Sequence, residues 1–218
     1  MTDDVLDHSR RKFFYFGAAA LFASLTTSHA MAQSASNKPK IGVIGSGHIG
    51  GTIGGLWVKA SHSVLFSSRH PEELKPLTDS LGPLAKDYGP KFAGKIVIDP
   101  ANAVARRDGE DLLKETKEKG IGATTESYLK GSHVVRAFNS MSYTHFVKEA
   151  HRAGDPMAIP IAGDDERAVQ VASQLVRDAG FEPVAVPLAR AQEFAQGGPL
   201  YGQQLTGKAL RERFGLAK

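Results

Sequence analysis

The sequence contains no cysteine among its 218 residues. This absence excludes thiol catalysis, iron–sulfur clusters, covalently attached haem and disulfide bonds. An excess of one charge is also missing, because the net charge is only +4 and the basic residues are spread along the chain. The sequence therefore does not indicate nucleic acid as a partner. The hydrophobic content of 41% is enough for one domain with a sizeable core.

Metal motifs and membrane spans are lacking as well. No pair of histidine or carboxylate residues has the spacing of metal ligands, so we predict no metal site. An apolar stretch at residues 14–25 is shorter than the about 20 residues that a membrane-spanning helix needs. No internal repeat is visible, so the chain does not read as a solenoid or another repeat architecture.

The first 32 residues have the three parts of an export signal. A twin-arginine element, SRRKFF at residues 9–14, is followed by the apolar stretch and then by Ala30-Met31-Ala32, which fits a cleavage site. We therefore expect a twin-arginine signal peptide at residues 1–32, a linker at 33–39 and a periplasmic mature protein with no stable membrane anchor. The alternative is an ordinary, weakly amphipathic N-terminal segment.

A strand–turn–helix–strand pattern begins at Lys40. An apolar run at residues 41–44 leads into Gly45-Ser46-Gly47-His48-Ile49-Gly50, which matches G-x-G-x-x-G, and a helical pattern and a second strand at residues 63–67 follow. In a dinucleotide-binding unit the first glycine permits the tight turn, the second admits the pyrophosphate, and the third lets the helix pack on its strand. The N-terminus of the helix then faces the phosphates. We predict these six residues as cofactor-binding, with a plain glycine-rich turn as the alternative.

The end of the second strand indicates which dinucleotide is bound. Sites that prefer NAD end this strand with a carboxylate, but no acidic residue occurs here before Glu72. The strand ends instead in Ser67, Ser68 and Arg69, and two hydroxyls with a guanidinium suit the 2′-phosphate of NADP. The alternative is a polar loop with a solvated arginine.

The remaining chain alternates strands with helices. This alternation predicts an α/β fold in one domain, with a Rossmann-like, doubly wound and mostly parallel sheet and a C-terminal helix. Asp164 is expected to cap the helix that follows the strand at residues 157–162, and Pro160 suggests an edge or bulge position for that strand. Strands are expected at residues 95–99, 133–138, 157–162 and 182–186, and helical segments at 71–84, 110–119, 127–130, 143–152, 164–179 and 202–213, with a polar loop at 101–109.

Several motifs in order resemble one family. They are IGVIGSGHIGG, the serine–serine–arginine strand end, GKIVIDPANAV, VVRAFNSMSY, IPIAGDD and GGPLYGQQL, and they extend from Lys40 to the C-terminus. The chain resembles the predicted dinucleotide-binding enzymes related to NADPH-dependent deazaflavin-coenzyme oxidoreductases. It is also similar to the reductase domain of membrane ferric reductases and to the N-terminal domain of pyrroline-carboxylate reductases.

The resemblance implies hydride transfer between NADP(H) and a small-molecule acceptor, a flavin or deazaflavin. It places residues 45–49 at the pyrophosphate, and Ser68 and Arg69 at the 2′-phosphate. Asn102 and Asn139 follow strands and would lie near the nicotinamide or the acceptor, as candidate catalytic residues. The alternative for each asparagine is a turn residue that bonds its own backbone. The resemblance also implies a homodimer, with residues 200–216 as its surface.

The chain between the second strand and Lys95 has room for one helix and a loop, but not for the two strands and two helices that the resemblance implies there. Only 25 residues, 70–94, separate Arg69 from Lys95, and none of them forms a run rich in valine and isoleucine. We infer an internal deletion of about thirty residues, given typical element lengths, near residues 84–87. The missing strand would flank the first strand at the ligand-binding crevice. We expect the strand at 96–98 to take its place beside residues 41–44; the alternatives are an open gap or a partner chain. The loss leaves a second functional reading, an NADP-binding protein with little or no catalysis.

Overall fold

A computed structural model describes residues 38–67 and 92–216 of the chain. Contacts divide the chain into Met1–Pro39 and Lys40–Lys218, and the architecture below is that of the second unit. The predicted leader, the predicted helix at 71–84, the inferred deletion and residues Ser68 and Arg69 lie outside the described residues. Within them, no helix is long and apolar enough to cross a membrane.

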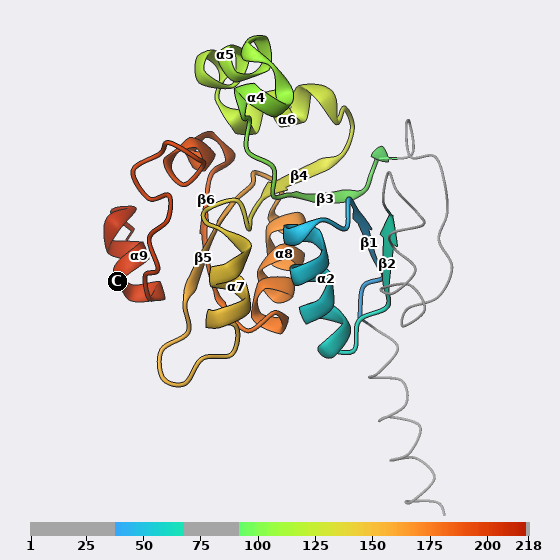
Figure 1. The fold of residues 1–218 in the computed structure, drawn as a ribbon, viewed down its shortest axis with the longest axis vertical. Coiled ribbons are helices and arrows are strands. Elements are labelled where there is room, and N and C mark those ends of the chain that lie inside the picture. The colour runs from blue at the N-terminus through green and yellow to red at the C-terminus, as the bar shows by residue number, and fades with distance from the viewer. Residues whose placement is uncertain (1–37, 68–91, 217–218) are drawn as a thin grey trace, which may run out of the picture. The chain divides into compact units, whose positions relative to one another are not determined.

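The unit has an α/β fold that alternates strands and helices (Figure 1). This confirms the predicted fold class and the C-terminal helix. The elements, in chain order, are β1 (Ile41–Ile44), α2 (His48–Lys59), β2 (Val64–Ser67), β3 (Ile96–Asp99), α4 (Ala105–Asp108), α5 (Glu110–Lys119), α6 (Ile121–Tyr128), β4 (His133–Arg136), α7 (Tyr143–Glu149), β5 (Ala158–Ala162), α8 (Glu166–Asp178), β6 (Glu182–Val186), η3 (Leu188–Glu193) and α9 (Gly207–Arg213).

The described strands form two sheets. β1 and β2 make a parallel pair, while β3, β4, β5 and β6 form a four-stranded sheet in that order. Two of its three neighbouring pairs, β3–β4 and β5–β6, are parallel like β1–β2, whereas β4–β5 is antiparallel through Arg136 and Ala162. The expected pairing of β3 with β1 is therefore wrong. β3 pairs with β4 only, so among the described strands β1 has an unpaired side where the resembled family has its additional strand.

β5 is the most buried strand, and apolar clusters cover both of its faces. Ile159 and Ile161 point into a cluster with α2, α7 and α8, whereas Ala158 and Ala162 point into a second cluster with α6, η3 and α9. Alternate residues of a strand face opposite sides, so one apolar strand can serve two cores. Helices therefore lie on both faces of this sheet, as a doubly wound fold requires.

Pro160 lies inside this buried strand without losing a hydrogen bond. The carbonyl of Met157 accepts from the N–H of Glu182 in β6, whereas the N–H of Ala158 turns the other way and donates to Leu205. Pro160 has the same orientation as Ala158, so its missing N–H faces away from β6, where β4 pairs with β5 only at Ala162. Proline was predicted to lie at an edge or bulge of a sheet. Pro160 lies inside the sheet instead, at a position where no N–H is needed for a hydrogen bond between strands.

Several element boundaries differ from the sequence prediction. β4 ends at Arg136 rather than at residue 138, because Phe138 has a left-handed backbone with φ +60°. The predicted loop at 101–109 contains α4. The short helix predicted at 127–130 overlaps only the end of α6, which begins at Ile121. The helix predicted from residue 202 is α9, which starts only after its cap, Thr206. Asp165, not Asp164, caps α8 by accepting the N–H of Ala168, while Asp164 accepts the N–H of Leu188.

Candidate functional site

The glycine turn between β1 and α2 has the predicted geometry. Gly45 has φ +84°, a left-handed conformation that favours glycine. A Cβ at Gly50 would overlap the carbonyl oxygen of Gly45 and lie 3.0 Å from Cγ1 of Val43, so α2 packs on β1 only because this residue lacks a side chain. At Gly47, in contrast, a Cβ would meet nothing within 4 Å, which leaves the approach to the helix N-terminus open.

The N-terminus of α2 is able to receive an anion. No side chain caps it, and its first turn has no acidic residue. The first hydrogen bond of the helix runs from the N–H of Gly51 to Gly47, so the N–H groups of His48, Ile49 and Gly50 have no partner within the helix. The positive end of the helix dipole adds to their attraction for phosphate.

Ser46 and Ser67 take part in the turn through their backbones. The carbonyl of Ser67 accepts the N–H of Gly45 at 2.9 Å and the N–H of Ser46 at 3.1 Å, which ties the glycine turn to the end of β2. The N–H of Ser46 is therefore engaged, whereas the N–H groups of the next residues are left to a ligand. The predicted 2′-phosphate site cannot be followed further, because Ser68 and Arg69 lie outside the described residues.

The turn is linked to the end of β4 by a pair of stacked rings. The imidazole of His48 lies parallel to the ring of Tyr143, with centroids 4.4 Å apart and an angle of 12° between the planes. Tyr143 begins α7, four residues after Asn139. Tyr143 is the last residue of the motif VVRAFNSMSY, and no role was predicted for it from the sequence.

Asn102 and Asn139, which follow the neighbouring strands β3 and β4, lie together. The side-chain amide of Asn102 donates to the backbone carbonyl of Asn139 at 2.7 Å, and the amide of Asn139 donates to Oδ1 of Asn102 at 3.3 Å. Oδ1 of Asn102 also accepts the N–H of Gln196 at 3.2 Å. The asparagines thus bond to each other rather than to their own turns, and they join the C-terminal loop to the ends of β3 and β4.

The segment after β4 contains buried polar atoms without partners. Asn139 and Ser140 are each 2% exposed, and among the described residues neither Oδ1 of Asn139 nor Oγ of Ser140 has a hydrogen-bond partner. The carbonyl of Ser140 accepts the N–H of Gly202, so the C-terminal loop also reaches this point. Native proteins rarely leave such atoms unsatisfied, and a bound molecule or water is the usual explanation.

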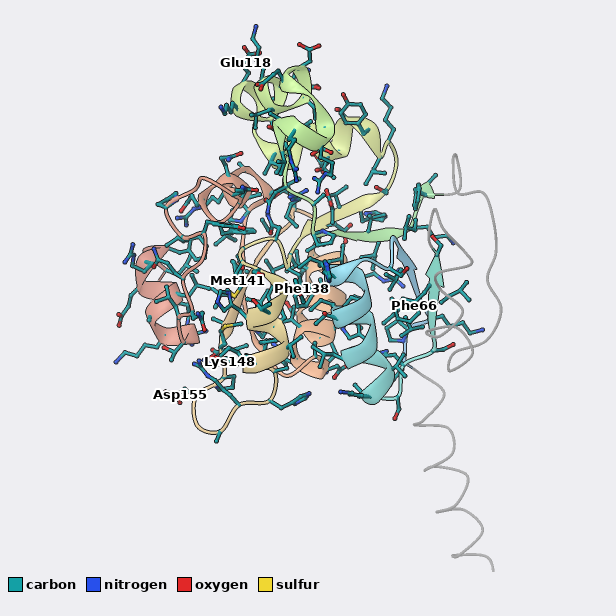
Figure 2. All side chains as sticks on the ribbon, in the orientation of Figure 1. Phe66, Glu118, Phe138, Met141, Lys148 and Asp155 are labelled. Carbon is teal, nitrogen blue, oxygen red and sulfur yellow. The ribbon has the colours of Figure 1, made fainter. Side chains whose placement is uncertain are left out.

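The backbone just before Asn139 is strained. Phe138 is buried and has φ +60°, a conformation that costs a residue with a side chain about 1–3 kcal/mol. The ring of Phe138, which Figure 2 labels, is held edge-on by Trp57 of α2, Phe146 of α7 and Phe181. The strain sends the chain out of β4 directly into Asn139 and Ser140, and no sequence pattern indicated it.

Residues 40–89 match the family described as NADP oxidoreductase, coenzyme F420-dependent. The matched segment starts at β1 and contains the complete β1–α2–β2 unit, and the family consists of NADP-dependent oxidoreductases. The resemblance stated from the sequence is confirmed. No curated protein matches the sequence significantly.

Solved structures confirm the fold over most of the chain. The protein SMa0349 of Sinorhizobium meliloti is similar at 22% identity with a TM-score of 0.60, covering 77% of this chain and 95% of that one. A protein of Arthrobacter sp. FB24 named as an F420-dependent NADP reductase is similar at 20% identity with a TM-score of 0.59. That match covers 82% of this chain and 96% of the other.

Proposed function

We propose that this protein binds NADP(H) at the turn between β1 and α2 and transfers a hydride between the nucleotide and a flavin or deazaflavin acceptor. The observation that carries this proposal is the convergence of the motifs. The stacked pair His48–Tyr143 joins the glycine turn to the segment after β4, and Asn102 joins that segment to the C-terminal loop. A ligand on the helix N-terminus would therefore meet the asparagine pair at its other end.

The residues present fit the two ends of the nucleotide. The free N–H groups of His48, Ile49 and Gly50 would hold the pyrophosphate, and the open side of Gly47 would admit it. The unpartnered Oδ1 of Asn139 could accept from a carboxamide, and Oγ of Ser140 could donate to one. The nicotinamide ring supplies the hydride, and the protein contributes mainly orientation and exclusion of water.

The preference for NADP over NAD belongs to the same proposal. It depends on Ser67, Ser68 and Arg69, of which only the first is described by the structure. A guanidinium beside two hydroxyls offers several donors to a 2′-phosphate. The first carboxylate after the strand is Glu72, so no nearer acidic side chain would repel the phosphate.

A second candidate function is favoured by the unpaired side of β1. In a doubly wound sheet, ligands bind where the strand order reverses, next to the first strand. Here β1 pairs with β2 only and β3 with β4 only, so the described strands leave a gap at this place. A protein with this gap could hold the nucleotide through its phosphates and yet fail to position an acceptor.

Location and assembly complete the proposal. Export by the twin-arginine pathway, which carries folded proteins, would let the protein load its nucleotide before it reaches the periplasm. A homodimer remains part of the proposal, although the apolar residues Leu210 and Phe214 of the predicted surface pack in the protein's own core. A second copy would therefore have to contact the polar face of α9.

Binding and turnover distinguish the two functions. The full chain is titrated with NADPH and with NADH, and riboflavin, FMN and a deazaflavin are then added in turn while nicotinamide absorbance is followed. Hydride transfer requires NADPH binding and oxidation that depends on the acceptor. Saturable NADPH binding without turnover supports the second function. If neither nucleotide binds, both functions are wrong.

A further inference from the structure

Arg136 is one of the largest side chains that the described part of the protein buries completely. It is the last residue of β4 and is 1% exposed. Taking a charge out of water is costly, and a buried ion pair is often no more stable than apolar residues of the same volume. The burial of Arg136 therefore points to a role in fixing a geometry rather than in stability alone.

The guanidinium is held by side chains from two other elements. Its Nη1 pairs with Oδ2 of Asp99, the last residue of β3, and donates to Oγ1 of Thr125 in α6 at 3.0 Å. Thr125 in turn donates to Oδ2 of Asp99 at 2.9 Å. Asp99 and Arg136 are also partners in the register of the parallel strands β3 and β4. The ion pair thus fastens the ends of these two strands to each other.

The same ion pair binds the backbone of Ala101 on both sides. The N–H of Ala101 donates to Oδ1 of Asp99 at 2.8 Å, and the carbonyl of Ala101 accepts from Nη2 of Arg136. These two groups belong to the peptide units before and after Ala101. Because both units are held, the pair sets the direction in which the chain enters Asn102.

Asn102 carries this position to two other segments. Its side chain donates to the carbonyl of Asn139 and accepts from the side-chain amide of Asn139 and from the N–H of Gln196. The exposed Arg107 adds one contact from the other side, to the carbonyl of Asn102 at 2.5 Å. A displacement of Ala101 would therefore move the contacts that join the end of β4 to the C-terminal loop.

We propose that Arg136 is a positioning residue: with Asp99 it fixes the turn that places Asn102 against the segment after β4 and the C-terminal loop. Arg136 touches neither nucleotide nor acceptor and acts through Asn102. A guanidinium suits this task because its planar fork can bond a carboxylate and a carbonyl at the same time. The inference rests on the proposed function, because the place that Arg136 orders is the expected nicotinamide end of the site.

The first test does not depend on catalysis. In the ¹⁵N-labelled full chain, Arg136→Met keeps much of the volume and removes every donor. The backbone amide of Gln196 and the side-chain amide of Asn102 should then shift in the NMR spectrum, because the turn that holds them is released. Circular dichroism checks that the variant folds.

Arg152→Met is the matched control for this substitution. Arg152 follows α7 and also bonds a carboxylate and a backbone carbonyl, those of Glu149 at 3.0 Å and Asp155 at 2.7 Å. Its loss should leave the signals of Gln196 and Asn102 unchanged. Shifts of equal size in both variants would mean that the response is a general effect of losing an arginine, and the proposal would be overturned.

The second test is kinetic and uses NADPH with whichever of riboflavin, FMN or the deazaflavin the wild type reduces. Arg136→Met should lower kcat about 10- to 100-fold, because a misplacement of about 1 Å can cost about 100-fold. The dissociation constant of NADPH should hardly change, since the N-terminus of α2 holds the phosphates. Arg136→Lys, which returns donors for the carboxylate and the carbonyl, should restore most of kcat.

A double-mutant cycle shows whether Arg136 acts through Asn102. In an Asn102→Ala background, Arg136→Met should lower kcat by only about twofold or less, because the contact through which it acts is already gone. If Arg136→Met does not fold, Thr125→Val takes its place, since it keeps the side-chain shape and removes the hydroxyl that bridges the ion pair. Its loss of kcat should be smaller, about 2- to 10-fold, and should likewise disappear with Asn102→Ala.

The outcomes separate this inference from the proposed function. The role of Arg136 is overturned if the signals of Gln196 and Asn102 stay in place in a folded variant, if Arg136→Lys restores nothing, or if the loss of kcat is equally large without the side chain of Asn102. If the wild type reduces no acceptor, the proposed function fails by itself, and the NMR comparison still decides whether Arg136 orders the asparagine pair.

Discussion

The β1–β2 pair and the β5–β6 pair begin from similar sequence and end in different environments. Both are parallel pairs joined by a helix, and both β1 and β5 are short apolar runs. All five residues of β5 are buried, whereas residues of β1 alternate between half-buried and exposed. Ile159 of β5 is 0% exposed, but Ile44 of β1 is 57% exposed.

The difference lies in what covers each pair. β5 has a core on both faces, whereas among the described residues β1 and β2 send only one face into a core, through Val43 and through Phe66, which Figure 2 labels. The opposite face of β1–β2 carries Ile44 and Leu65, two of the exposed large apolar residues. A short apolar run therefore predicts a strand. The burial of that strand depends on which other segments pack against it, and the run itself does not indicate these segments.

The largest expected effect is on stability, when an isoleucine of β5 and an isoleucine of β1 are each replaced by alanine. Ile159→Ala should lower the free energy of unfolding by about 2–5 kcal/mol, because it opens a cavity in a closed core. Ile44→Ala should lower it by about 1 kcal/mol or less, because the side chain is mostly in solvent. Urea denaturation followed by circular dichroism measures both. An equal loss at both positions would mean that the outer face of β1 is covered in solution, and the contrast would disappear.

The next prediction concerns nucleotide binding at the end of β2. Arg69→Ala should weaken NADPH about 10- to 100-fold, because charge-assisted hydrogen bonds to the 2′-phosphate are worth about 1.5–3 kcal/mol, and it should hardly change NADH. Lys59→Ala, at the exposed end of α2, is the matched removal of a positive charge. Dissociation constants come from fluorescence or calorimetric titration. Equal weakening of both nucleotides would contradict a role for Arg69 at the 2′-phosphate.

Alanine substitutions at two glycines of α2 distinguish the effect of close packing from the effect of helix propensity. Gly50→Ala should destabilise the protein by about 1–3 kcal/mol, because the new Cβ overlaps the carbonyl of Gly45, and it should weaken NADPH by displacing the turn. Gly55→Ala meets nothing within 4 Å and should stabilise the helix by up to about 1 kcal/mol. Thermal unfolding with and without NADPH measures both effects. A Gly50→Ala variant with native stability and affinity would refute the close packing of α2 on β1.

The smallest expected effect is at Asp108 of α4, a helix that contacts α5. The pKa of Asp108 is lowered to about 2, chiefly by the hydrogen bonds from Arg107. Because the pKa is lower in the folded state, the pair stabilises the protein above pH ~4, and this contribution is lost as the pH falls from ~4 to ~2. NMR of the carboxyl carbon should give a midpoint near 2. Arg107→Gln should raise the midpoint, whereas Arg106→Gln should not, and an unchanged midpoint in Arg107→Gln would exclude this cause.

Local sequence patterns predicted the elements near the glycine turn well. The G-x-G-x-x-G motif located the β1–α2 turn, because two of its positions require glycine. Gly45 has a left-handed backbone, and Gly50 packs so closely on the carbonyl of Gly45 that a side chain would overlap it. Asn102 and Asn139 each follow a strand, and their side chains meet because parallel strands bring their carboxyl ends to one edge. Their roles toward a ligand stay predictions.

Features that depend on distant packing escaped the sequence. The left-handed backbone of Phe138 is held by aromatic rings from three other segments, so no local pattern reveals it. The helix α6 lies in a polar stretch with weak amphipathic character, and it forms because Ile121 packs in the second core. The burial of Arg136 among Asp99, Thr125 and Ala101 likewise depends on residues that come together only in the folded chain.

The sequence by itself determined the α/β class, the nucleotide-type turn and the order of the motifs, because each rests on local periodicity, on glycine conformations or on the direction of a strand. Only the tertiary structure decided that β1 and β3 do not pair, that β5 is covered on both faces, and that the asparagine pair meets the C-terminal loop. These outcomes depend on which segments, far apart in the chain, compete for the same apolar surface and the same hydrogen bonds. Such competition is settled by the packing of the whole unit rather than by any single stretch.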